Sequence, residues 1–148
     1  MLNPNKRIAV LSIVGIILSS YLTYLHYVPE ELDSSFCNIS NYLSCSTVNK
    51  SSYALFLGVP VAIIGIIGFL LLFYLSISKM PHTRIALFYS SALGILFMLY
   101  LFTAELLIIK AICTFCIAVL LVICTIFFIA CKAYGRESIQ FVKDIRLE

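Results

Sequence analysis

The sequence predicts an all-α integral membrane protein, with residues 1–148 forming one bundle of four transmembrane helices. Of the 148 residues, 62% are hydrophobic and 11% are charged, and the mean hydropathy is +1.08. A soluble domain is roughly 45–50% apolar and about 25% charged. One small core could not bury this apolar excess, so lipid must solvate much of it. Four apolar stretches also match the roughly 20 helical residues that cross a bilayer.

The four predicted spans cover residues 8–28, 59–78, 85–104 and 112–131. Lys6 and Arg7 precede the first span as in a secretion signal. The apolar run is too long for such a signal and no small-residue cleavage site follows, so we expect an uncleaved first span. Pro60 fits the first turn of the second helix, where its missing N–H costs nothing. For the cytoplasmic tail at 132–148, a short amphipathic helix and a plain solvated segment are both open.

Glu105 and Lys110 interrupt an apolar run that extends from Ile85 to Cys131. That run is too long for one crossing, so the two charges mark the hairpin between the third and fourth spans. Irregular backbone is costly in hydrocarbon, because no water is present to satisfy its polar groups. We therefore expect the hairpin to lie at the membrane interface.

Basic residues predict the orientation of the spans. Four crossings place both termini and the turn near residue 80 on one side, and eight of the ten lysines and arginines lie there. The eight are Lys6, Arg7, Lys79, Arg84, Lys132, Arg136, Lys143 and Arg146; the other two are Lys50 and Lys110. The positive-inside rule makes the richer side cytoplasmic. We expect a multi-pass protein of a prokaryotic plasma membrane, with both termini inside and loop 29–53 outside.

Four of the six cysteines fall on the outer side of this topology. Cys37 and Cys45 lie in the loop with the spacing C-x7-C, and Cys113 and Cys116 form a C-x-x-C where the fourth span begins. A helix N-terminus favours a thiolate, and the small ring of a C-x-x-C disulfide opens and closes readily. One sulfur can face water and the other a lipid-soluble acceptor. The four cysteines together therefore favour redox chemistry.

Other interpretations of the cysteines stay open at this stage. Both pairs could be structural disulfides of a non-enzymatic membrane subunit, which would resist mild reductant where a relay would exchange. The C-x-x-C could be half of a zinc site, although nothing complements it, and outward-facing thiols could carry a soft metal. Cys124 and Cys131 lie about 12 and 22 Å below Cys116 along an α-helix. We interpret them as small hydrophobes and assign them no role.

Several short motifs lie along the chain. They are Cys37, Cys45-Ser46-Thr47-Val48, Ser51, Gly58-Val59-Pro60 and Cys113-Thr114-Phe115-Cys116. In these motifs and in the spans between them, the chain resembles the vitamin K epoxide reductase family over nearly its whole length. The resemblance implies a four-helix bundle around a quinone, which is a substrate, with the outer loop closing over it.

The resemblance also implies roles for individual residues. A thioredoxin-like partner would reduce the disulfide between Cys37 and Cys45. Cys45 would then attack Cys113, and Cys116 would face the quinone. Ser51 matches the family's loop serine near the redox centre, so we expect it to contact the substrate. No metal or flavin is required.

Two positions and one missing domain distinguish the chain from known members. An asparagine and a tyrosine that hold the vitamin K head group in vertebrate enzymes align with Ala54 and Leu120, which cannot donate a hydrogen bond. We therefore expect a respiratory quinone as acceptor, and little epoxide reduction. The thioredoxin-like domain fused to many bacterial relatives is absent before Glu148, so we expect a separate partner protein. The net charge of +3 is too small and too spread to suggest nucleic acid.

Overall fold

The computed structural model describes residues 3–28, 48, 50–51, 54–56, 58–78, 80 and 82–147, with side chains described as far as residue 135. Its long helices are α1 (Pro4–Tyr27), α3 (Val61–Ile77), α4 (Thr83–Ala104) and α5 (Thr114–Leu147). A π-helical turn, η3 (Glu105–Ile109), extends α4, and two short strands, β1 (Leu55–Phe56) and β2 (Val59–Pro60), pair antiparallel. The predicted fold class, an all-α membrane bundle, is confirmed.

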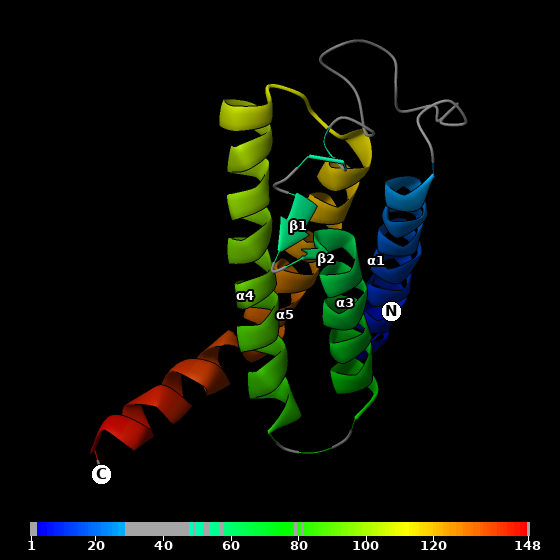
Figure 1. The fold of residues 1–148 in the computed structure, drawn as a ribbon. Coiled ribbons are helices and arrows are strands. Elements are labelled where there is room, and N and C mark those ends of the chain that lie inside the picture. Colours follow the sequence, from blue (N-terminus) through cyan, green and yellow to red (C-terminus); the bar gives the residue numbers. More distant parts are fainter. Residues whose placement is uncertain are drawn as a thin grey trace.

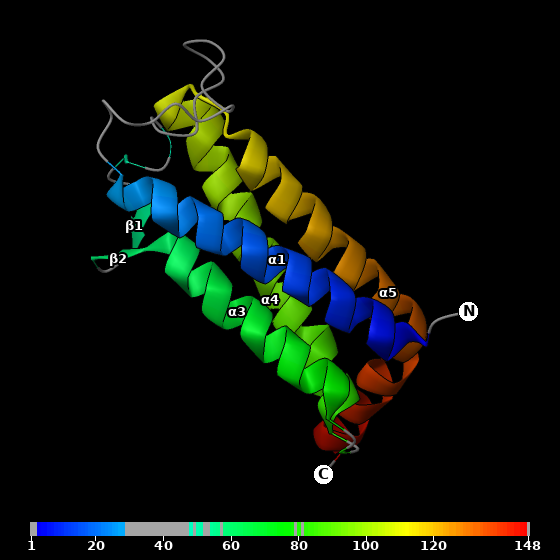
Figure 2. The same cartoon turned by 90° about the vertical axis from the view of Figure 1, so that its right-hand side faces the viewer.

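The four long helices stand side by side as one bundle (Figure 1). The most extensive contacts join α1 to α3, α4 to α5 and α1 to α5. The first residues of α1 and the turn between α3 and α4 lie at one end, whereas the β hairpin and the start of α5 lie at the other (Figure 2). The chain therefore runs the length of the bundle four times.

The helices are apolar enough to cross a membrane. Within the described residues, Pro4–Tyr27, Thr83–Ile109 and Thr114–Gly135 meet both the length and the hydropathy expected of a span. Helix α3 has only 17 residues, about 26 Å of helix at 1.5 Å per residue. Each of the four long helices carries large apolar side chains that are more than half exposed. Among them are Ile17, Ile67, Leu93, Leu121 and Phe128. Lipid is the solvent such a surface requires, so the chain is a multi-pass membrane protein.

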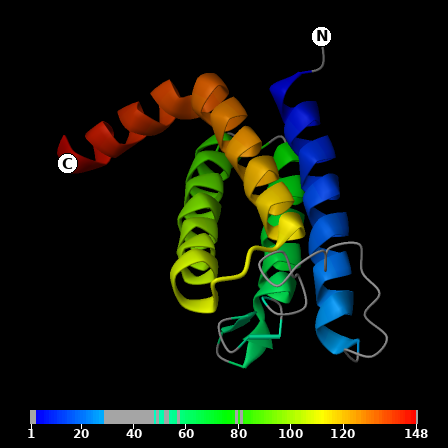
Figure 3. The same ribbon diagram turned by 90° about the horizontal axis from the view of Figure 1, so that it is seen from above.

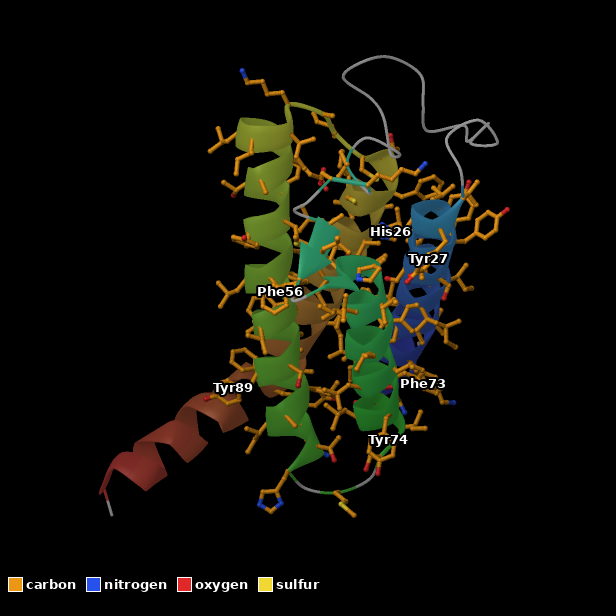
Figure 4. All side chains as sticks on the ribbon, in the orientation of Figure 1. His26, Tyr27, Phe56, Phe73, Tyr74 and Tyr89 are labelled. Carbon is orange, nitrogen blue, oxygen red and sulfur yellow. The ribbon has the colours of Figure 1, made fainter. Side chains whose placement is uncertain are left out.

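Exposed tyrosines mark both ends of the bundle. Figure 4 shows Tyr27 at the end of α1 near the β hairpin, and Tyr74 towards the opposite end of α3. Both side chains are more than half exposed, at 68% and 61%. Tyrosine rings favour the two membrane–water interfaces, where the ring meets lipid and the hydroxyl meets water. The exposed rings thus lie where interfaces bounding the apolar spans would fall.

Small residues let α1 and α3 approach closely. A Cβ atom at Gly15 of α1 would lie 2.5 Å from ring atoms of Phe69 on α3. Likewise, a Cβ at Gly65 of α3 would lie 3.0 Å from the hydroxyl of Ser19 on α1. Close backbone approach at small residues is a main source of helix association in lipid, where the hydrophobic effect contributes little.

Several helix boundaries differ from those expected. Helix α3 begins at Val61 and Pro60 is its N-cap, so the placement of Pro60 in the first helical turn was wrong. Pro60 instead ends the β hairpin, whose turn contains Gly58 at a φ of +83°. Of the two alternatives for the tail, the structure shows a helix, because α5 continues to Leu147. Its last part leaves the bundle (Figure 3).

Candidate active site

A cavity of about 580 Å³ lies inside the bundle, lined by residues of α1, α3, α4 and α5. Its walls are almost entirely apolar. The polar side chains in the lining are those of Ser19, Ser51, Ser90, Glu105 and Cys116. Small-molecule sites typically enclose about 300–1,000 Å³ with a few polar groups in apolar walls. The cavity therefore suits an apolar ring compound that carries few polar atoms.

The C-x-x-C motif forms the beginning of α5. The backbone N–H of Ile117 donates to the carbonyl of Cys113 at 3.1 Å, which makes Cys113 the N-cap of the helix. The backbone N–H of Cys116 donates to the Sγ of Cys113 at 3.4 Å. A sulfur in this position receives the free amides at the positive end of the helix dipole, an arrangement that stabilises a thiolate.

The two cysteines of the motif have different surroundings. Cys116 lines the cavity, whereas Cys113 does not line it and is fully buried at 0% exposure. Cys113 lies between the spans Thr83–Ile109 and Thr114–Gly135. Hydrogen bonding to Cys116 lowers the pKa of the Cys113 thiol from its ordinary value, against the opposing effect of burial. Only one cysteine of the pair therefore lines the cavity.

An aromatic contact fixes the motif against the first helix. The rings of Phe115 and Tyr21 lie 4.9 Å apart, centroid to centroid, at a tilt of 54°. Aromatic pairs at this separation attract beyond the area they bury. Phe115 thus links the start of α5 to α1 and holds the flanking cysteines in place.

Glu105 belongs to the site, although we expected it in an interfacial hairpin. Its side chain is 3% exposed, and it lines the cavity. Its Oε2 accepts the backbone N–H of Cys113 at 3.3 Å. Lys110, the other charged residue of the expected hairpin, is exposed. It follows the π-helical segment with a left-handed φ of +54°. π-helical turns are rare and often occur at functional sites.

Residues that precede the β hairpin also line the cavity. The hydroxyl of Ser51 donates to the carbonyl of Val48 at 2.7 Å, and both residues line the cavity. Ala54 also lines it and is buried. Leu120 is not among the lining residues and instead packs against the core of the bundle. Position 54 therefore lines the cavity and position 120 does not.

The other four cysteines of the chain are not among the described residues of this site. Cys37 and Cys45 lie outside the described residues, so their relation to Cys113 stays a prediction. Cys124 is exposed and Cys131 is half-buried, and neither lines the cavity. Among the described residues, no cluster of three histidine, cysteine or acidic side chains could hold a metal ion.

Together, the fold and the site define a class: a multi-pass helical membrane protein with a dithiol beside an apolar internal cavity. The sequence model of the Vitamin K epoxide reductase family matches residues 6–131. The chain belongs to this family, as its motifs indicated. A comparison with curated proteins gave no match. Membership makes the chain a membrane thiol–disulfide oxidoreductase of the general quinone-linked class.

Proposed function

We propose that the chain oxidises a separate thioredoxin-like protein and passes the electrons through two cysteine pairs to a membrane quinone, which supports disulfide bond formation. The observation that best supports this is the asymmetry of the C-x-x-C motif. Cys116 lines an apolar cavity of about 580 Å³ that fits a quinone ring, and Cys113 lies outside that cavity at the start of the same helix.

The proposed relay conserves electrons and protons. The dithiol of the partner reduces the Cys37–Cys45 disulfide and becomes a disulfide itself. Cys45 then attacks Cys113, which breaks the Cys113–Cys116 bond, and Cys37 resolves the mixed disulfide. The reduced inner pair finally gives two electrons and two protons to the quinone, which leaves as hydroquinone.

The electrostatics of Cys113 suit its place in this order. When Cys37 attacks the mixed disulfide at Cys45, Cys113 must leave as a thiolate. A leaving thiol with a lower pKa departs faster, and hydrogen bonding to Cys116 lowers the pKa of Cys113. The helix N-terminus therefore favours release of the inner pair in its reduced form.

The lining of the cavity supports a plain quinone as substrate. Ala54 offers no hydrogen bond to a head group, and the hydroxyl of Ser51 is already donated to Val48. Ser51 lines the cavity, and its hydroxyl oxygen can still accept a hydrogen bond from the hydroquinone product, so we assign Ser51 to substrate contact. A respiratory quinone with a long apolar tail suits a cavity whose other walls are apolar.

The orientation that fits this relay has both termini in the cytoplasm. The two ends of the bundle then lie on opposite sides of the plasma membrane, and the start of α5 faces the outside. Disulfide exchange with a partner is sustained in that oxidising compartment. The excess of basic residues near the termini supports the same direction.

The proposal is tested with purified protein, reduced bacterial thioredoxin as donor and a short-chain ubiquinone analogue. The wild-type protein should reduce the quinone, and Cys37→Ser should lose this coupled turnover. The same variant should still reduce the quinone once a chemical reductant has reduced its inner pair. If wild-type protein oxidises the donor without reducing any quinone, the relay does not end at a quinone.

A further inference from the structure

Glu105 is a buried acid beside the redox pair, on a helix that is otherwise apolar at this depth. Glu105 is 3% exposed and lines a cavity whose walls are almost all apolar. Ionising a carboxyl group away from water is costly unless other groups compensate. A position in contact with lipid-like surroundings would ordinarily hold an apolar residue.

The groups that face Glu105 are those of the C-x-x-C motif. Its Oε2 accepts the backbone N–H of Cys113 at 3.3 Å, and Cys116 lies three residues further along the same helix start. Cys116 and Glu105 both line the cavity. One carboxyl group therefore lies beside the C-x-x-C motif and, with Cys116, lines the site proposed for the acceptor.

A purely structural role accounts for only part of this geometry. An oxygen that caps the N–H of Cys113 could belong to a neutral amide, which would avoid the cost of burying an acid. The position of the carboxyl group in the same cavity lining as Cys116 serves no capping purpose. A group that takes up and releases a proton explains this position.

We propose that Glu105 carries a proton from Cys116 to the quinone during the last step of the relay. This inference rests on the proposed function. The Glu105 carboxylic acid gives its proton to a quinone oxygen as the two sulfurs give up two electrons, and it takes back the proton of the Cys116 S–H group. Cys113 and Cys116 become a disulfide, and Cys113 releases the second proton needed for hydroquinone. Glu105 ends in the form in which it began.

The proposal separates the two halves of the reaction, so each is measured alone. In the first assay, reduced bacterial thioredoxin reduces the oxidised protein in the absence of quinone. In the second, the pre-reduced protein reacts once with a short-chain ubiquinone analogue. The variants are Glu105→Gln, which keeps a hydrogen-bond acceptor, and Glu105→Asp, which keeps a carboxylate on a shorter stem. Thr103→Val is the control, because Thr103 is an exposed residue of α4 that only bonds the carbonyl of Leu99.

Glu105→Gln should slow the quinone step at least about 100-fold, as expected for loss of a proton-transfer group. Glu105→Asp should slow it about tenfold, because the shorter stem reaches Cys116 poorly. Both should keep the wild-type rate with thioredoxin, as should Thr103→Val in both assays. If Glu105→Gln reduces the quinone at the wild-type rate, the inference about Glu105 is overturned while the proposed function stands. The same holds for Glu105→Asp if only that variant folds. If the wild-type protein itself reduces no quinone, the proposed function fails and the inference fails with it.

Discussion

The Sγ of Cys113 lies 3.4 Å from the backbone nitrogen of Cys116, so the first cysteine of the motif caps the helix that carries the second. This contact gives Cys113 two separable roles. As a sulfur it is proposed to exchange disulfides, and as an N-cap it satisfies an amide that would otherwise lack a partner within the helix.

Replacing Cys113 should separate capping from chemistry. Serine is a good N-cap, whereas alanine is a poor one, and the difference is typically about 1 kcal/mol. Cys113→Ser and Cys113→Ala should both be inactive, but only the alanine variant should lose about that much unfolding free energy in detergent. Equal stability of the two variants would show that the cap contributes nothing.

Cys124→Ala combined with Cys131→Ala, away from the cavity, should keep full turnover.

Removing Cys116 should trap the relay halfway. In this variant Cys113 has no partner in its own motif, so its thiolate can only attack the Cys37–Cys45 disulfide. Attack at Cys45 would give a Cys45–Cys113 disulfide and leave Cys37 reduced. Mass spectrometry of Cys116→Ser under non-reducing conditions measures this link. A dominant Cys37–Cys113 link, or none between loop and helix, would contradict the proposed order.

The orientation is open to labelling in intact cells. Single cysteines introduced near Lys79 and in the tail should be shielded from an impermeant thiol reagent, and one near Glu31 should react. The reason is the excess of basic residues on the side of the termini. Labelling at position 79 without labelling at 31 would reverse the topology and, with it, the redox compartment.

Selection against epoxide should depend on position 54. Wild-type protein should reduce quinone much faster than vitamin K epoxide with the same donor. Ala54→Asn should raise epoxide turnover more than Leu120→Tyr does, because Ala54 lines the cavity and Leu120 does not. Epoxide turnover equal to quinone turnover in the wild type would mean that other groups, such as Ser51, hold the head group.

The contact between α1 and α3 predicts the effect of two matched substitutions. A methyl group at Gly15 would meet the ring of Phe69 at 2.5 Å, whereas one at Gly68 would meet nothing within 4 Å. Gly15→Ala should therefore lose about 1–3 kcal/mol of unfolding free energy from overpacking. Gly68→Ala should be neutral or slightly stabilising, since alanine is the better helix former. The measurement is thermal unfolding in detergent. If both variants unfolded at the same temperature, the close contact between Gly15 and Phe69 would be refuted.

Sequence patterns predicted the fold well because lipid imposes one dominant constraint. Stretches of about 20 apolar residues have few alternatives to a membrane helix. The pattern could not place Pro60, because local strand pairing with Leu55 decided where the helix starts. The side chains of the tail gave no preference between helix and coil, and the continuation of α5 settled that choice.

Residue type and spacing predicted a C-x-x-C at a helix start, which the structure shows, but they could not predict the packing around it. A C-x-x-C at a helix start pointed to Cys113 and Cys116 from spacing alone. Glu105 was misplaced because a charge in an apolar run usually marks an interface. The signal that could have found it was its position eight residues before Cys113. The cavity-facing side of α5 depends on how the helices rotate against one another, so the sequence alone could not remove Leu120 from the lining.

The coupled stoichiometry of purified protein tests the central claim most directly. Reduced thioredoxin is supplied in limiting amounts with excess short-chain ubiquinone analogue, and hydroquinone is measured against donor disulfide formed. The relay predicts one hydroquinone for each donor disulfide in the wild-type protein, and none in Cys116→Ser. Hydroquinone formation that continues without Cys116, or donor oxidation with no hydroquinone in a folded wild-type protein, would contradict the account.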